Sequence, residues 1–217
     1  MDRRNFFRSA IGKASEMVVE HADRKVASHA AHWVRPPFAL PELEFLLTCT
    51  RCGDCIDACP HRVVFPLSAR RGTKFAGTPA LDLLNMGCHL CEDWPCVKSC
   101  GVGALKLPDV EEDEQPATPT LAKASVDTDE CLPYKGPECG ACAGSCPVPG
   151  ALTWDRQKPR INPEVCVGCG LCREACILEP KAIQIESLYK EVADADHGVH
   201  ESATRRSGDI RGGVTGN

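Results

Sequence analysis

The segment Cys49-Thr-Arg-Cys52-Gly-Asp-Cys55-Ile-Asp-Ala-Cys59-Pro60 has the cysteine spacing Cys-x2-Cys-x2-Cys-x3-Cys-Pro. Three thiolates at this spacing on a tight loop can wrap one face of a [4Fe-4S] cube, while the fourth leaves toward a neighbouring cluster. The same spacing, without the final proline, recurs in a group formed by Cys166, Cys169, Cys172 and Cys176. These two groups predict that iron–sulfur clusters organise the fold.

The remaining cysteines form two groups in which the spacing is altered. The spacing Cys-x2-Cys-x4-Cys-x3-Cys occurs at Cys88, Cys91, Cys96 and Cys100. The spacing Cys-x7-Cys-x2-Cys-x3-Cys occurs at Cys131, Cys139, Cys142 and Cys146. All 16 cysteines are then used in groups of four, which predicts four [4Fe-4S] clusters. A [3Fe-4S] site would be indicated by a missing ligand, and none is missing.

The fourth cysteine of each group is expected to bind the cluster of the paired group. The four predicted ligand sets are Cys49, Cys52, Cys55 with Cys100; Cys88, Cys91, Cys96 with Cys59; Cys131, Cys139, Cys142 with Cys176; and Cys166, Cys169, Cys172 with Cys146. Zinc is the alternative, but zinc sites usually use two cysteine pairs separated by a longer loop. His89 lies beside Cys88, and we expect a loop residue there rather than an iron ligand.

The composition leaves little material for a large apolar core. Of the 217 residues 43% are hydrophobic but only 5% are aromatic, while Cys, Gly and Pro number 16, 18 and 17. A disulfide scaffold would be expected in a secreted chain, and the sequence has neither a clean signal peptide nor an apolar run of transmembrane length. The net charge of -5, made more negative by ligating thiolates, excludes nucleic acid as a favoured partner.

Each cysteine group is expected to form a unit of strand, cysteine loop, short helix and strand. An aliphatic residue lies five positions before the first cysteine in three groups, at Leu83, Val126 and Ile161, whereas Glu44 holds that position in the first group. Strand-like runs follow the groups at residues 63–65, 104–107, 151–154 and 182–185. Two units pair into one module, so the predicted fold class is α+β, with two tandem bacterial-type 2[4Fe-4S] ferredoxin modules.

The predicted modules span residues 38–107 and 121–190, and the acidic, proline-rich segment 108–120 is expected to be a linker. Apolar residues recur at helical steps within residues 1–34, which predicts an amphipathic helix whose apolar face packs on the protein itself, a partner or a membrane. The tail 191–217 has no apolar period, so we expect it to be disordered.

The chain resembles the NapG and MauM ferredoxin-type proteins, which are related to NapF. The resemblance covers about residues 35–188 and is carried by Cys88-His-Leu-Cys91-Glu-Asp-Trp-Pro-Cys96, by a third group that begins Cys131-Leu132 and closes Glu138-Cys139, and by Cys176-Ile177-Leu178-Glu179. It implies two modules, four [4Fe-4S] clusters and a relay of single electrons. The implied partners are a membrane-bound quinol-oxidising subunit and a terminal reductase, dehydrogenase or cytochrome.

The sequence favours an electron carrier over an enzyme. It has no P-loop, no dinucleotide-binding fingerprint and no nucleophile elbow, so no catalytic residue or organic substrate is predicted. The alternative is a maturation or chaperone factor for a metalloenzyme, as the NapF resemblance suggests.

The first residues bear on the compartment. Asp2-Arg3-Arg4-Asn5-Phe6-Phe7-Arg8 resembles the core of a twin-arginine export signal. The stretch that follows is interrupted by charges such as Lys13, Glu16 and Glu20, whereas an export signal needs an uncharged apolar run. We therefore expect a cytoplasmic protein, or one peripheral on the cytoplasmic membrane face, with a degenerate signal and a periplasmic location as the alternative.

Overall fold

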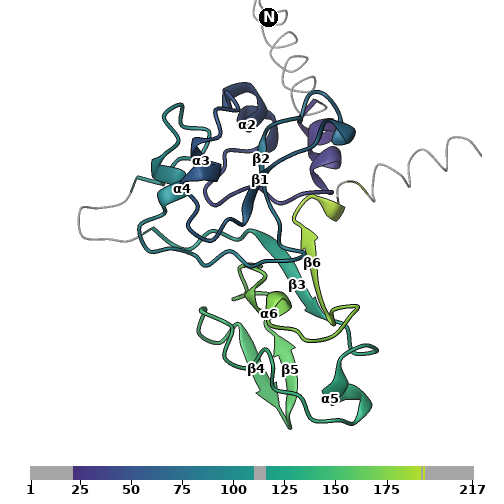
Figure 1. Ribbon diagram of the computed structural model, residues 1–217. Helices are drawn as coiled ribbons and strands as arrows, with labels where there is room; N and C mark the ends of the chain where they lie inside the picture. Colours follow the sequence, from purple (N-terminus) through teal and green to yellow (C-terminus); the bar gives the residue numbers. More distant parts are fainter. Residues whose placement is uncertain (1–21, 110–115, 192, 194–217) are drawn as a thin grey trace, which may run out of the picture. The chain divides into compact units, whose positions relative to one another are not determined.

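The computed structural model describes residues 22–109, 116–191 and 193 (Figure 1). The chain separates into two compact units, His32–Leu188 and a smaller unit drawn from the chain ends, Met1–Ala31 and Tyr189–Asn217. Most of the predicted N-terminal segment and tail, and residues 110–115 of the predicted linker, lie outside the described residues. Within the described ranges, no helix combines the length and the hydropathy needed to cross a bilayer.

The described part of the predicted N-terminal helix is shorter than expected. Residues 22–30 are helical, and Ala27 and Ala30 are buried while His29 is exposed, so the buried face differs from the predicted one, which included His29. The helix was predicted to reach residue 34, but Val34 instead accepts a backbone hydrogen bond of 2.8 Å from the N–H of Leu81. This strand-like pairing requires extended backbone, which ends the helix early.

The second predicted module has the expected order of strands and helices. Its elements are β3 (Ala122–Val126), α5 (Leu132–Lys135), β4 (Leu152–Asp155), β5 (Lys158–Ile161), α6 (Leu171–Glu174) and β6 (Ile183–Ser187). The first and last strands, β3 and β6, form one antiparallel sheet, and β4 and β5 form another (Figure 1). The helix of the third cysteine group is displaced, because α5 begins directly after Cys131 within the seven-residue insertion, with Pro133 in its first turn.

The first predicted module has similar elements with one clear departure. They are α2 (Glu42–Thr48), α3 (Asp54–Asp57), β1 (Val64–Pro66), the 3-10 helix η1 (Ala69–Arg71), β2 (Pro79–Leu81) and α4 (Pro95–Lys98). The strand predicted before Cys49 is the helix α2 instead. Residues 38–40 take the place of that strand, since Leu40 donates to the carbonyl of Ala104 (3.1 Å) and Lys106 to that of Phe38 (3.0 Å). The predicted strand at 104–107 is therefore reduced to a single bridge, Ala39 to Leu105.

The hairpins of the two modules differ in the length of their connection. Residues 156 and 157 join β4 to β5 in a tight turn, in which both have positive φ angles of 47° and 68°. The connection between β1 and β2 is residues 67–78, which we call the basic loop because its only charged residues are cations. Its base is closed by hydrogen bonds from Leu67 to the carbonyl of Thr78 (2.9 Å) and from Gly77 to that of Leu67 (2.8 Å).

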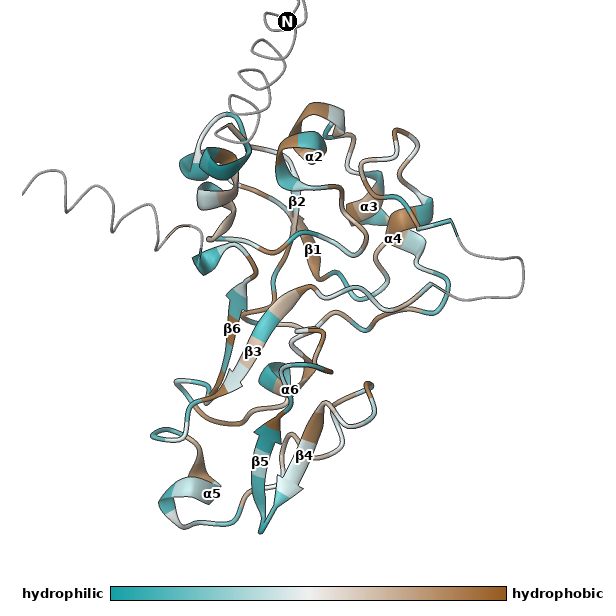
Figure 2. Ribbon diagram, turned by 180° about the vertical axis from the view of Figure 1, so that it is seen from behind, coloured by the Kyte–Doolittle hydropathy of each residue, from teal (hydrophilic) through white to brown (hydrophobic). Residues whose placement is uncertain are grey.

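The first predicted module and residues 121–188 of the second lie inside the single unit His32–Leu188. One buried cluster joins Val64 and Leu83 of the first module to Ala122 and Val167 of the second. The strand β1, which contributes Val64 to this cluster, is hydrophobic, whereas β5 is mostly hydrophilic (Figure 2). The backbone N–H of Cys88 also donates to the carbonyl of Cys169 at 2.7 Å.

The joint between the modules is tight at Gly87. A Cβ on this residue would lie 2.6 Å from Leu171 Cδ2 and 2.8 Å from Leu171 Cα. The Gly87 N–H also donates to Glu174 Oε2 across the joint at 2.7 Å. Only a residue without a side chain permits this approach.

A buried ion pair ties the start of the unit to the basic loop. Arg35 and Glu42 are 8% and 1% exposed, and two hydrogen bonds of 2.6 and 2.9 Å join guanidinium to carboxylate. Arg35 also donates to Thr78 Oγ1 (2.9 Å) and to the carbonyl of Pro79 (2.7 Å), and Trp33 Nε1 donates to Glu42 (3.3 Å). Glu42 opens α2, so this pair explains why the segment before Cys49 is a helix rather than a strand.

Candidate metal-cluster sites

In the structure twelve of the sixteen cysteines line three cavities in groups of four, and we name these three sets and the remaining four cysteines by their members. Set A is Cys49, Cys52, Cys55 and Cys100; set B is Cys59, Cys88, Cys91 and Cys96; set C is Cys146, Cys166, Cys169 and Cys172; and set D is Cys131, Cys139, Cys142 and Cys176. Each of sets A, B and C lines its own cavity.

Set A is positioned by two helices and a glycine turn. Helix α2 ends at Cys49, whose N–H donates to the carbonyl of Phe45 at 2.8 Å. Gly53, with φ of 92°, turns the chain between Cys52 and Cys55. The fourth member, Cys100, arrives from the end of α4, and its sulfur accepts a hydrogen bond from the backbone N–H of Leu105 at 3.3 Å.

Set B lies beside aromatic and imidazole side chains. Trp94 lines this cavity and is buried. His61 and His89 also line it, with their rings stacked 3.6 Å apart and nearly parallel. The sequence analysis did not single out His61, although its position two residues after Cys59 was an available signal.

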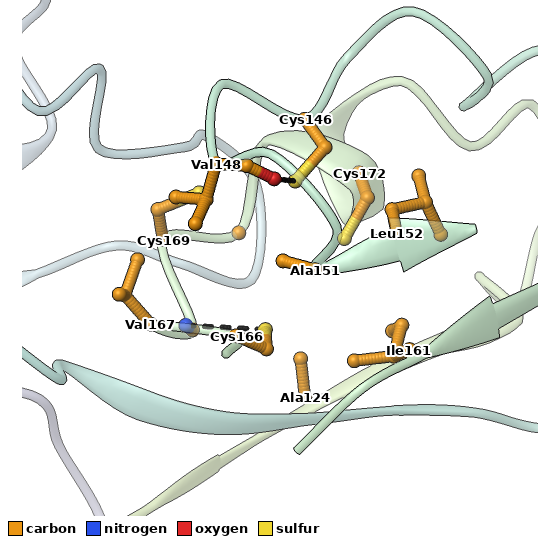
Figure 3. A pocket seen from close by; sticks show the side chains of 12 residues that line it. Ala124, Cys146, Val148, Ala151, Leu152, Ile161, Cys166, Val167, Cys169 and Cys172 are labelled. Atoms are coloured by element: carbon orange, nitrogen blue, oxygen red, sulfur yellow. Dashed lines mark hydrogen bonds between the residues drawn. The ribbon is translucent and has the colours of Figure 1, made fainter. Parts of the chain in front are cut away.

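Set C is enclosed by aliphatic side chains (Figure 3). The sulfur of Cys166 accepts a hydrogen bond from the N–H of Gly168 at 3.4 Å, shown dashed in Figure 3. Gly168 has φ of 68°, and a Cβ there would lie 2.0 Å from the carbonyl oxygen of Ala122, so the loop requires glycine. Such N–H···S bonds stabilise negative charge on a ligated cluster and so raise its reduction potential.

Set D surrounds Cys142, whose thiol is affected by the three other members. The pKa of the Cys142 thiol is raised to about 11, by burial first and also by the negative charges of Cys131, Cys176 and Cys139, against a backbone hydrogen bond that lowers it. Trp154 packs against the apolar cluster that contains Cys142 and Cys172.

The thiols of the other sets show the same behaviour. Burial is the largest cause that raises the pKa of Cys55 to about 11 and those of Cys96 and Cys172 to about 12, followed by the charges of neighbouring cysteines. Without metal these thiols are therefore protonated at neutral pH, and iron must displace their protons. Crowded thiolates of which at least one in each set is buried need a compensating cation, which fits the chemistry of a [4Fe-4S] cluster.

An unpartnered donor provides a second test of fit. Among the described residues, the Trp154 indole N–H is the one buried side-chain polar group without a hydrogen-bond partner. Buried donors without partners are costly, and the sulfur atoms of a cluster are acceptors. The thiols and the Trp154 indole N–H therefore fit [4Fe-4S] clusters, while ligation by the sixteen cysteines stays a prediction.

The four sets lie in series. Cys55 of set A and Cys96 of set B lie in one buried cluster. Cys88 of set B and Cys169 of set C lie in another, and the N–H of Cys88 donates to the carbonyl of Cys169 at 2.7 Å. Cys172 of set C and Cys142 of set D lie in a third. The spatial order is therefore A, B, C, D, although the cysteine group that supplies most of set D precedes that of set C in the chain.

Comparison with known proteins agrees with this arrangement. Two family models described as 4Fe-4S binding domains match residues 46–71 and 159–177. The ferredoxin-type protein NapG of Escherichia coli is 32% identical over 206 residues, which cover 89% of this chain and 87% of NapG. The methylamine utilization ferredoxin-type protein MauM of Paracoccus denitrificans is 32% identical over 71% of each chain. The ferredoxin-type protein NapF of Escherichia coli is 30% identical over 74% of this chain and 88% of NapF. This chain therefore belongs to the NapG and MauM family of ferredoxin-type iron–sulfur proteins.

Proposed function

We propose that this protein is an electron carrier that binds four [4Fe-4S] clusters in sets A to D and passes single electrons between redox partners. The observation that carries the proposal is the serial arrangement of four thiol sets inside one compact unit. When bound, such clusters supply reversible one-electron oxidation and reduction. The chain belongs to a ferredoxin-type family, which supports a carrier without a substrate site of its own.

The side chains around the sets have two tasks in this function. The sixteen cysteines hold the clusters, and aliphatic walls such as Val167 and Ile161 keep water from set C. Backbone N–H groups such as those of Leu105 and Gly168 bond to ligand sulfur and tune the potential. The joint at Gly87 keeps set B close to set C, which joins the two modules into one path.

The partners we propose are a membrane-bound quinol-oxidising subunit and a terminal reductase, dehydrogenase or cytochrome. The name of the relative MauM, which refers to methylamine utilization, supports service to a redox enzyme. We propose a cytoplasmic location, and a periplasmic one is the alternative; residues 1–21, which bear on this choice, lie outside the described residues.

The test begins with anaerobic isolation of the tagged protein from its native cells in mild detergent. We expect copurified redox subunits, and a potentiometric titration with several one-electron steps. A protein that stays redox-silent after full reconstitution would contradict the carrier function. Stable binding to a cofactor-free precursor enzyme, in preference to the finished enzyme, would instead indicate maturation.

Replacing Gly87 with alanine should interrupt the path between the modules. The new Cβ would overlap the backbone of Leu171, and overpacking of this kind costs about 1–3 kcal/mol of stability. We expect an unchanged iron content, lower stability and slower equilibration of electrons between the modules after pulse reduction. The matched control is Gly101→Ala, because a Cβ on Gly101 meets no atom within 4 Å. Equal behaviour of the two variants would contradict the role of the joint.

Replacing Trp154 with phenylalanine should lower the potential of one cluster in the second module. The indole N–H would donate to sulfur, and a bond of about 1 kcal/mol corresponds to roughly 40 mV for a one-electron couple. A redox titration followed by electron paramagnetic resonance measures this shift. Tyr134→Phe is the control, since the Tyr134 hydroxyl donates to the Pro159 carbonyl at 2.9 Å rather than to sulfur. Unchanged potentials in Trp154→Phe would refute the N–H···S bond.

A further inference from the structure

The basic loop carries a concentration of positive charge that is unusual for this chain. Arg70, Arg71 and Lys74 are exposed, and no acidic residue lies between Pro66 and Asp82, although the net charge of the protein is -5. Within the described part of the chain, none of these three cations forms an ion pair with a carboxylate. Their charge is therefore available to another molecule.

This loop forms part of the wall of set A. Arg51 lies between Cys49 and Cys52 in the sequence, and its guanidinium donates to the backbone carbonyl of Lys74 at 2.8 Å. Gly77 at the end of the loop lines the set A cavity together with Arg51. The backbone of the loop at Lys74 and Gly77 thus borders the residues of set A.

Set A is also the most accessible of the four sets. All sixteen cysteines are within the described residues, and Cys52 alone among them is exposed. The surroundings include exposed apolar side chains, because Leu47 precedes Cys49 by two residues and Val102 lines the cavity, with exposures of 80% and 45%. An exposed apolar centre with charges beside it is the usual composition of a protein–protein interface.

The opposite end of the series has no basic loop beside it, although the set A segment also carries two exposed carboxylates, Asp54 and Asp57. Set D is flanked by exposed acidic residues, Asp129, Glu130 and Glu138, and the nearby Lys135 lies 3.9 Å from Glu130. Sets B and C are interior to the series, so an external partner meets set A or set D. The two ends therefore select partners of different charge.

We propose that the basic loop and Arg51 form the docking surface for the acidic face of a protein redox partner, which exchanges electrons with set A at Cys52. This inference rests on the proposed electron-carrier function. The exchange moves one electron between the group held by set A and the partner's centre, so that one is reduced as the other is oxidised, with no bond made or broken. A protein is favoured over a membrane because an exposed ligand cysteine serves electron exchange, whereas a lipid surface contains no redox centre.

The test compares small oxidants of opposite charge on the fully loaded, reduced, full-length protein. The probes are trianionic tris(oxalato)cobaltate(III) and tricationic hexaammineruthenium(III), mixed anaerobically in a stopped-flow instrument at several ionic strengths. The variant Arg70→Gln/Arg71→Gln/Lys74→Gln removes three charges outside the cavity wall of set A. The matched control, Arg156→Gln/Lys158→Gln/Arg160→Gln, removes three charges from the corresponding hairpin of the second module.

At low salt we expect the loop variant to react about tenfold more slowly with the anionic probe, and the control to change by less than about twofold. The cationic probe should react faster with the loop variant, and added salt should remove both effects. Equal effects in the two variants, or none in either, would overturn the docking surface. A wild-type protein that reduces neither probe would instead refute the electron-carrier function.

A second measurement separates a protein partner from a membrane. Sedimentation with phosphatidylglycerol vesicles should recover little wild-type protein, and no more than the loop variant. Strong, salt-sensitive binding of the wild type that is lost in the loop variant would overturn the proposal in favour of a lipid surface.

Discussion

Replacing Cys52 and Cys100 together with alanine should remove a single cluster, whereas replacing Cys52 and Cys59 together should remove two. The first pair belongs to set A, although its members are far apart in the sequence. Cys59 lies in the same sequence motif as Cys52 but belongs to set B. The expected loss is a quarter of the iron in the first variant and half in the second, because we propose that each set holds one of four clusters.

This result is measured as iron and acid-labile sulfide per chain after anaerobic reconstitution, with resonance spectra to count the remaining clusters. The single variants Cys52→Ala, Cys59→Ala and Cys100→Ala are the references, and each should lose one intact [4Fe-4S] cluster. A loss of two clusters from the Cys52 and Cys100 pair, with one from the Cys52 and Cys59 pair, would show that ligation is uncrossed.

Replacing Glu42 with glutamine should destabilise the protein by about 3–5 kcal/mol, since it leaves the buried Arg35 guanidinium without a counter-charge. Both residues are almost fully buried, and Arg35 also holds Thr78 and Pro79 at the end of the basic loop. Anaerobic denaturant unfolding of the loaded protein, followed by cluster absorbance and circular dichroism, measures the change.

Two further variants separate this buried pair from ordinary surface charge. Asp155→Asn removes an exposed pair with Arg160, whose atoms lie 3.1 Å apart, and should cost no more than about 1 kcal/mol. The double variant Arg35→Met/Glu42→Leu should recover much of the loss, because two apolar side chains leave no unpaired buried charge. If Glu42→Gln were no more harmful than Asp155→Asn, the ion pair would have no structural role.

The sequence predicted the local structure well where each signal lay within a short segment. The aliphatic residues Val126 and Ile161, each five positions before the first cysteine of its group, predicted strands that the structure places at β3 and β5. The strand predicted before Cys49 was wrong. In the structure Arg35 forms a buried ion pair with Glu42, 7 residues away, and this contact favours the helix α2. The predicted position of the short helix was also wrong in the third cysteine group. The segment between Cys131 and Cys139 is longer than the corresponding segment of the other groups and has room for the helix α5.

Cysteine spacing was enough to propose the four ligand sets, because the loops that carry three ligands are short and the crossing of the fourth follows from the pairing of units. The structure brings the members of sets A, B and C to one cavity each, and ligation stays a prediction. Spacing could not predict the order of the sets in space. That order depends on the packing of Gly87 against Leu171 and on the hydrogen bond from Cys88 to Cys169, both between residues more than 80 positions apart. Tertiary packing therefore decides that set B meets set C, because no local pattern records which faces of two folded modules are complementary.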